Sequence, residues 1–233
     1  MTGPSTVDEA AGLPAAVLWD LDGTLLDSEK LWDIPIHEFA ERLGHTLAPA
    51  TRLAMTGTNV PTTMRLLFSE AGIDPTDREL ADGAEWINGR MARLFRTEAV
   101  FRPGARDALR AVRDAGVPTA LVTSTERPLV EIALDTVGRD HFDVVVCGDE
   151  VDRRNKPLPD PYLKAARLLG VDPTACVAIE DSPTGVSSAV AAGCVVLVIP
   201  CEVEVDRGER RVFRESLVGF DAAVLRELSA RRR

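Results

Sequence analysis

The chain contains the stretch Ala15-Ala16-Val17-Leu18-Trp19-Asp20-Leu21-Asp22-Gly23-Thr24, in which an apolar run leads directly into two aspartates. The run Ala16–Trp19 predicts a short buried strand, because its side chains do not alternate between apolar and polar. Asp20 and Asp22 lie two residues apart where this strand ends. Two carboxylates at such a place are costly unless a cation or a shared proton offsets their repulsion. The stretch therefore predicts a ligand site with a divalent metal and a reacting group at the end of a strand.

Four further apolar runs follow this pattern and also predict buried strands. They are Thr119–Val122, Val144–Cys147, Cys176–Ile179 and Val195–Ile199. Between them lie helical patterns long enough for crossover connections, namely Ala105–Ala115, Pro128–Val137, Pro161–Leu169 and Pro183–Ala192. The alternation of strands and helices predicts an α/β fold with a doubly wound parallel sheet.

The long interval between the first and second predicted strands does not follow this alternation of strands and helices. Its helical patterns cover Glu29–Leu43, Pro61–Ala71 and Arg78–Arg96, and no run in it reads as a strand. A crossover needs far fewer residues, so we expect an inserted helical domain at 28–97 that acts as a lid over the sheet. The α/β core would then comprise residues 14–27 and 98–233, after a flexible leader at 1–13.

Composition excludes several classes of protein. A formal net charge of −10 argues against a nucleic-acid partner, which would require a basic face. No apolar run reaches the roughly 18–20 residues that span a bilayer, and no signal peptide is recognisable. The four cysteines form no C-x-x-C pair, which favours reduced thiols. We therefore expect a cytoplasmic protein without a membrane partner, whose oligomeric state the sequence leaves open.

Polar side chains stand at or shortly after the ends of four predicted strands. Besides Asp20 and Asp22, they are Thr123-Ser124, Lys156 and Glu180-Asp181. In a parallel sheet all carboxyl ends share one edge, so these groups should converge. Carboxylates hold Mg²⁺ or act as nucleophiles, hydroxyl and amide groups donate to phosphate, and a lysine neutralises developing charge. The set predicts phosphoryl transfer to an acidic site with a metal.

These motifs resemble a known family. The segments Asp20-Leu21-Asp22-Gly23-Thr24, Thr123-Ser124, Lys156-Pro157 and Glu180-Asp181 resemble, in order, the four motifs of the haloacid dehalogenase superfamily. The helical insertion resembles the cap of its β-phosphoglucomutase-like phosphatases, and Asp27-Ser28-Glu29-Lys30-Leu31-Trp32 resembles the first helix of sugar-phosphate phosphatases. The resemblance covers most of the chain and implies a Rossmann-like core with a helical cap.

The resemblance also implies a role for each matching residue. Asp20 would be the nucleophile that forms an aspartyl-phosphate, and Asp22 would be the general acid and base. Mg²⁺ would be held by Asp20, by the backbone carbonyl of Asp22 and by Asp181, with Glu180 a ligand or its partner. Thr123, Ser124 and Lys156 would hold the phosphoryl group.

We therefore interpret the chain as a Mg²⁺-dependent phosphatase that acts on a small phosphorylated metabolite, with a sugar or polyol phosphate favoured. Two alternatives stay open: a β-phosphoglucomutase-like phosphomutase, and a phosphoacceptor receiver-type signalling domain. The mutase branch uses a cap histidine near the position of Trp32, which is not basic, and Asp22-Gly23-Thr24 counts against a receiver.

In the insertion, Trp32 is a candidate either to line the substrate pocket or to belong to the core of the cap. Arg52 and Arg65 are candidates to meet a substrate anion, although solvated helix arginines are more common.

Overall fold

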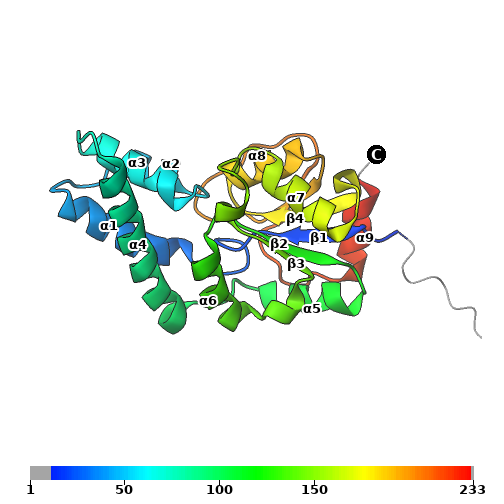
Figure 1. Cartoon of the computed structure of the whole chain (residues 1–233). Coiled ribbons are helices and arrows are strands. Elements are labelled where there is room, and N and C mark those ends of the chain that lie inside the picture. The colour runs from blue at the N-terminus through cyan, green and yellow to red at the C-terminus, as the bar shows by residue number, and fades with distance from the viewer. Residues whose placement is uncertain (1–11, 232–233) are drawn as a thin grey trace, which may run out of the picture.

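In the computed structural model, which describes residues 12–231, the strands form one parallel sheet with the order β3-β2-β1-β4-β5-β6 (Figure 1). Their bounds are β1 Ala16–Trp19, β2 Thr119–Val122, β3 Val144–Val146, β4 Cys176–Glu180, β5 Val195–Val198 and β6 Arg211–Phe213. Every neighbouring pair is parallel. Trp19 pairs with both Leu121 and Ile179. The central strands therefore end at the same height, and the residues that follow them lie at the same edge of the sheet.

Helices cover both faces of this sheet, as Figure 1 shows. The helices on one face are α5 Ala105–Asp114, α6 Arg127–Val137 and α9 Ala222–Ala230, and those on the other are α7 Asp160–Leu169 and α8 Pro183–Ala191. Short 3-10 turns lie at Arg139–His141, Gly148–Glu150 and Pro173–Ala175. Along β1, Val17 and Trp19 pack into one apolar cluster and Ala16 and Leu18 into the other. Burial on both faces explains why the strand sequences are apolar throughout.

Four helices between β1 and α5 stand beyond the carboxyl edge of the sheet, and we call them the cap helices (Figure 1). They are α1 Glu29–Arg42, α2 Pro49–Met55, α3 Val60–Glu70 and α4 Asp77–Glu98. They have an apolar cluster of their own, in which Phe39 packs against Phe68 at 6.0 Å between ring centroids. The base of α4 also joins the main core through Met91 and Phe95.

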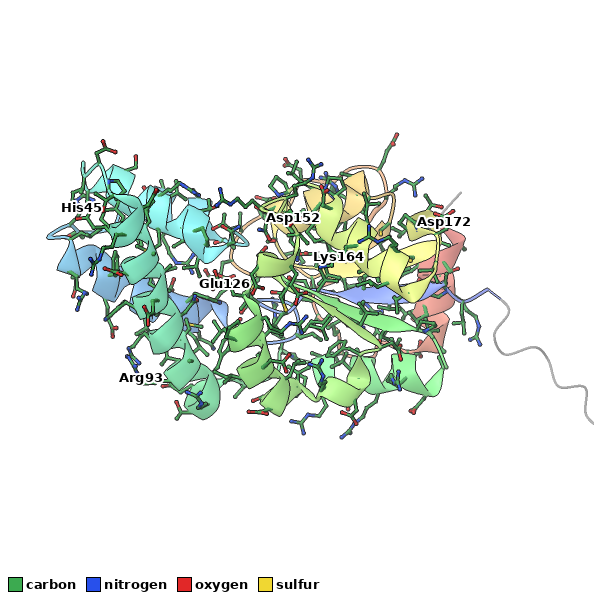
Figure 2. The ribbon with its side chains drawn as sticks, viewed as in Figure 1. His45, Arg93, Glu126, Asp152, Lys164 and Asp172 are labelled. Carbon is green, nitrogen blue, oxygen red and sulfur yellow. The ribbon has the colours of Figure 1, made fainter. Side chains whose placement is uncertain are left out.

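A polar contact joins the cap helices to the sheet region. Glu126, which precedes α6, accepts a 2.9 Å hydrogen bond from the side chain of Asn88 on α4. Figure 2 shows Glu126 at the junction between the cap region, where His45 lies in a loop and Arg93 on α4, and the sheet region, where Lys164 and Asp172 lie. The two parts therefore meet along α4 and α6 as well as at the strand ends.

The structure confirms the predicted doubly wound parallel sheet and its five predicted strands, with β3 and β5 each ending one residue earlier than expected. None of the predicted elements covers α2, β6 or α9. Helix α2 has only 7 residues, and β6 is a half-buried edge strand that begins with an arginine. Helix α9 carries an amphipathic pattern, with Leu225 and Leu228 buried, that could have revealed it. Most of the predicted leader at 1–13 lies outside the described residues.

Among residues 12–231, no helix combines the length and the apolar character needed to cross a membrane.

The two ends of α5 provide a stability test. Gly104 and Gly116 flank this helix with φ of +81° and +69°. A Cβ atom at Gly104 would lie 2.3 Å from the backbone of Leu217, whereas nothing lies within 4 Å of one at Gly116. We expect Gly116→Ala to lower the free energy of unfolding by ~1–2 kcal/mol, the cost of a left-handed alanine. Gly104→Ala should cost at least ~2 kcal/mol more, because the backbone of Leu217 must also move.

Urea unfolding of the wild type and the two variants measures the loss in the free energy of unfolding for each variant. Equal losses in the two variants would contradict the close packing of the 217–218 segment on the start of α5.

Candidate active site

Asp20 and Asp22 lie in the loop that leaves β1 at the carboxyl edge. The backbone N–H of Asp20 still donates to the carbonyl of Ile179 at 3.0 Å, so Asp20 is held in line with β4. Gly23 follows them, and a Cβ atom there would lie 2.1 Å from Oδ2 of Asp181. The glycine therefore allows the β1 loop and the residue after β4 to approach closely.

Lys156 reaches the same edge from the loop before α7. Its ammonium group donates to Oδ1 of Asp20 at 2.6 Å, to Oε1 of Glu180 at 2.6 Å and to the carbonyl of Val122 at 3.0 Å. Only 2% of the lysine side chain is exposed. The hydroxyl of Tyr162 donates to the same oxygen of Glu180 at 2.6 Å. One buried cation thus links the ends of three strands.

The charges in this group do not balance. Asp20, Glu180 and Asp181 are all buried, and Lys156 is the cation among them. Burial raises the pKa of Asp20 to about 8; Glu180 adds to this rise and Lys156 opposes it. Burial, together with the charges of Asp20 and Glu180, also raises the pKa of Asp181 well above its usual value. Burial alone would lower the pKa of Lys156, but Asp20 and Glu180 outweigh it and raise that pKa.

The group fits a second cation. Asp20, Glu180 and Asp181 each offer a carboxylate oxygen, and these oxygens lie within 4.8 Å of one another. Oδ2 of Asp20 and Oδ2 of Asp181 are buried without a hydrogen-bond partner. Buried carboxylate oxygens without a donor are costly, and oxygen ligands of this kind suit Mg²⁺. These three residues could therefore hold a hard divalent cation.

The side chain of Asp22 lies outside this group. Its Oδ1 accepts hydrogen bonds from Ser28 Oγ at 2.8 Å and from the indole N–H of Trp32 at 2.9 Å. Its Oδ2 accepts one from Thr125 Oγ1 at 2.7 Å. Donors at the start of α1 and after β2 thus fix the orientation of this carboxylate, which does not belong to the group that could hold a cation.

Thr123 and Ser124 follow β2 at the same edge. The hydroxyl oxygen of Thr123 accepts from the backbone N–H of Thr125 at 3.0 Å, so its own proton can be donated to a bound group. The hydroxyl of Ser124 donates to the carbonyl of Gly57, in the loop between α2 and α3, at 3.2 Å. This contact brings the cap helices over the strand ends.

A pocket lies between the cap helices and the strand ends. Five of the predicted residues line it from the sheet side, namely Asp20, Asp22, Thr123, Ser124 and Lys156. Glu180 and Asp181 lie behind Asp20 and do not line it. The cap helices contribute Trp32 and Arg52.

Arg65 is placed differently. It is exposed on α3, donates to Pro61 in its own helix and lines a neighbouring groove instead. Three residues that were not predicted as site residues also lie at the site: Thr125 and Tyr162, described above, and Glu29, which lines the pocket. Thr125 directly follows the Thr123-Ser124 motif, and this position was a signal that could have identified it.

Comparisons with known proteins agree with this geometry. The model of the haloacid dehalogenase-like hydrolase family matches residues 14–193. Hexitol phosphatase A of Escherichia coli is 36% identical over 199 residues, which cover 82% of this chain and 85% of that protein. Protein CbbY of Rhodobacter capsulatus is 30% identical over 195 residues, with coverage of 80% and 86%.

Solved structures share the fold. CbbY from Rhodobacter sphaeroides, in complex with phosphate, superposes with a TM-score of 0.77 at 30% identity and covers 89% of this chain and 96% of its own. A β-phosphoglucomutase from Clostridium difficile superposes with a TM-score of 0.81 and covers 94% and 98%, but at 18% identity it shows likeness of fold alone.

The charge imbalance at the site predicts a response to Mg²⁺ that does not depend on activity. Mg²⁺ at about 100-fold its Kd adds ~2.7 kcal/mol of stability, which in a chain of this size raises Tm by roughly 5–10 °C. In Asp181→Asn this rise should disappear, whereas the metal-free variant should unfold no earlier than wild type, because one of three like charges is gone. Calorimetry with and without Mg²⁺ measures both.

Asp149→Asn is the matched control and should keep the full rise. Asp149 belongs to a second acidic group with Cys147 and Glu150, but there Arg127 already pairs with Glu150 at 2.7 Å. A full Mg²⁺ response in Asp181→Asn, or its loss in Asp149→Asn, would show that the cation binds elsewhere.

Proposed function

The chain belongs to the haloacid dehalogenase-like hydrolases, and we propose that it is a Mg²⁺-dependent phosphatase that hydrolyses a small phosphorylated metabolite, with a sugar or polyol phosphate favoured. The family assignment and the phosphatases among its relatives support a phosphoric monoester hydrolase. The single observation that carries the proposal is the arrangement around Asp20. This carboxylate lines the pocket, contacts Lys156 at 2.6 Å and belongs to the acidic group that fits a cation.

In the first step, the Asp20 carboxylate attacks the phosphorus of the monoester. A bond forms between the Asp20 oxygen and phosphorus, and the bond from phosphorus to the leaving oxygen breaks. Lys156 offsets the negative charge that the attacking carboxylate and the phosphoryl oxygens bring together. Thr123 and Ser124 line the pocket with Lys156. The hydroxyl of Thr123 and the backbone N–H of Ser124 donate hydrogen bonds to the phosphoryl group and orient it.

Asp22 transfers a proton in each half of the reaction. Protonated, it gives its proton to the leaving oxygen, and the alcohol departs. Ionised, it takes a proton from the water that attacks the aspartyl-phosphate, so Asp20 is regenerated and inorganic phosphate is released. Ser28, Trp32 and Thr125 hold the carboxylate in place through both steps.

Asp20, Glu180 and Asp181 would hold Mg²⁺, together with the backbone carbonyl of Asp22 that the family resemblance implies. The unpartnered oxygens of Asp20 and Asp181 support this assignment. When bound, the ion neutralises phosphoryl charge and offsets the repulsion between a carboxylate nucleophile and an anionic substrate.

The cap helices would close the pocket against water. We propose that residues 28–97 form a cap domain and that residues 14–27 and 98–233 form the catalytic core. The contact between Ser124 and Gly57 supports a cap that closes over the strand ends. Trp32, which is not basic, is a cap residue that contacts Asp22, and this favours a phosphatase over the phosphomutase alternative. We further propose a cytoplasmic location, because the four cysteines are free thiols.

Phosphate release tests the proposed function. We expect the wild type to release inorganic phosphate from sugar and polyol monophosphates and from p-nitrophenyl phosphate, with Mg²⁺ required. Asp20→Asn should lower kcat by ~10³-fold or more, because the nucleophile is removed. Asp149→Asn should retain wild-type activity. Folded protein that releases no phosphate from any monoester with Mg²⁺ present would refute the proposal.

The contact between Trp32 and Asp22 yields a second test. Trp32→Phe removes the indole N–H and keeps an aromatic ring against Phe95, which packs edge-on at 6.4 Å. We expect kcat/KM for an alkyl phosphate to fall by ~10-fold, because its poor leaving group needs the proton from Asp22. For p-nitrophenyl phosphate, whose leaving group needs little protonation, kcat/KM should change little.

Trp86→Phe makes the same substitution elsewhere on the cap helices, where Trp86 packs on Phe39 at 5.7 Å, and it should affect neither substrate. If Trp32→Phe slowed both substrates equally, Trp32 would act through structure alone and not through Asp22.

A further inference from the structure

Two linkers join the cap helices to the sheet region, one before α1 and one after α4, and they hydrogen-bond to each other. Leu26 of the first linker and Phe101 of the second form an antiparallel β-bridge. The backbone N–H of Arg102 donates to the carbonyl of Leu25 at 2.9 Å. The chain therefore leaves the sheet region and returns to it at a single junction.

The first linker also folds back on the β1 loop. The backbone N–H of Gly23 donates to the carbonyl of Leu26 at 2.9 Å. This N–H shares a trans peptide unit with the carbonyl of Asp22, and in such a unit the two groups point in opposite directions. The carbonyl of Asp22 is therefore turned away from Leu26, and none of the backbone hydrogen bonds among residues 12–231 ends on it.

The guanidinium of Arg102 holds the next peptide unit of this loop. Arg102 lies at the end of the second linker and is half-buried. One terminal nitrogen donates to the carbonyl of Gly23, and the other donates to the carbonyl of Pro200, in the loop after β5, at 3.3 Å. The planar fork of an arginine suits such a double contact, because it holds its donors in a fixed geometry. One side chain thus joins the second linker, the β1 loop and the loop after β5.

The peptide unit that Arg102 holds also places Thr24. The hydroxyl of Thr24 donates to Oδ1 of Asp181 at 3.3 Å, and Oδ2 of the same carboxylate has no hydrogen-bond partner. Gly23 lies directly against this carboxylate, since a Cβ atom on it would be 2.1 Å from Oδ2. The backbone of the β1 loop therefore helps to position two of the proposed metal ligands, the carbonyl of Asp22 and the side chain of Asp181.

We infer that Arg102 is a positioning residue for Mg²⁺. By holding the carbonyl of Gly23, it fixes the backbone that presents the carbonyl of Asp22 and that contacts Asp181 through Thr24. This inference rests on the proposed function and adds to it a residue outside the four motifs. Arg102 is not among the described residues that line the pocket or form the acidic group, so its effect on the ion is indirect.

Electrostatic repulsion and positioning predict opposite effects when this arginine is removed. A positive charge beside a metal site repels Mg²⁺, so loss of the charge alone should tighten binding. Loss of a group that orients metal ligands should weaken binding instead. We expect the Kd of Arg102→Met for Mg²⁺ to be ~10-fold higher than that of the wild type, as measured by calorimetric titration without substrate.

Two further variants assign the effect to the hydrogen bonds of Arg102. Arg106 is exposed on α5, with its guanidinium 4.7 Å from the ring centroid of Phe101 in the same linker. Arg106→Met is the matched control, because it removes the same charge and leaves the bond to Gly23 in place, so its Kd should match that of the wild type. Arg102→Lys keeps the charge but not the planar fork, so its Kd should lie between those of the wild type and Arg102→Met.

Hydrogen exchange gives a second readout, which does not require the metal. If Arg102 holds the β1 loop, the amides of residues 21–26 should exchange faster in metal-free Arg102→Met than in metal-free Arg106→Met. The amides of α7 and β5 should exchange as in the wild type in both variants, because the change is local to the loop.

Equal or tighter Mg²⁺ binding by Arg102→Met than by the wild type would overturn the inference. Equal weakening in Arg106→Met, or unchanged exchange of residues 21–26 in Arg102→Met, would do the same. Binding at the wild-type Kd by Arg102→Lys would also overturn it, and this variant decides alone if Arg102→Met does not fold. A wild type that binds no Mg²⁺ would instead refute the metal site of the proposed function, and the inference with it.

Discussion

Three buried carboxylates share one ammonium group at the carboxyl edge of the sheet, and the surrounding structure holds them there. Lys156 contacts Asp20 and Glu180, while one oxygen of Asp20 and one of Asp181 have no donor. The parallel sheet makes this possible, because its central strands end level and place residues far apart in sequence together. The cost of burying like charges is offset when a cation binds, and this supports the proposal that these carboxylates hold a metal ion.

The cap helices complete the site from the other side. Trp32 on α1 donates to Asp22, and the carbonyl of Gly57 accepts from Ser124. The positions of Asp22 and Ser124 therefore both depend on the position of the cap helices. The same helices carry Arg52, which lines the pocket and pairs with Glu29. We propose that the strand ends hold the reacting groups and that the cap helices decide which molecules reach them.

Much of this arrangement could be predicted from sequence, for a physical reason. Strands buried on both faces are apolar throughout, so the polar residues that follow them stand out, as Asp20 and Lys156 do. The sequence did not indicate partners that depend on how helices pack. Tyr162 reaches Glu180 only because α7 lies against the sheet, and Arg52 meets Glu29 only because α2 packs on α1. Arg65 has the same residue type as Arg52 but faces outward from α3.

The central claim is that Asp20 becomes phosphorylated during turnover. The most direct test is to quench the enzyme with acid during hydrolysis of a hexitol monophosphate, reduce it with borohydride and map the product by mass spectrometry. Reduction converts an aspartyl-phosphate to homoserine, so homoserine at position 20, formed only with substrate and Mg²⁺, is the predicted result. Homoserine at another aspartate, or active turnover with position 20 unmodified at every quench time, would contradict the account.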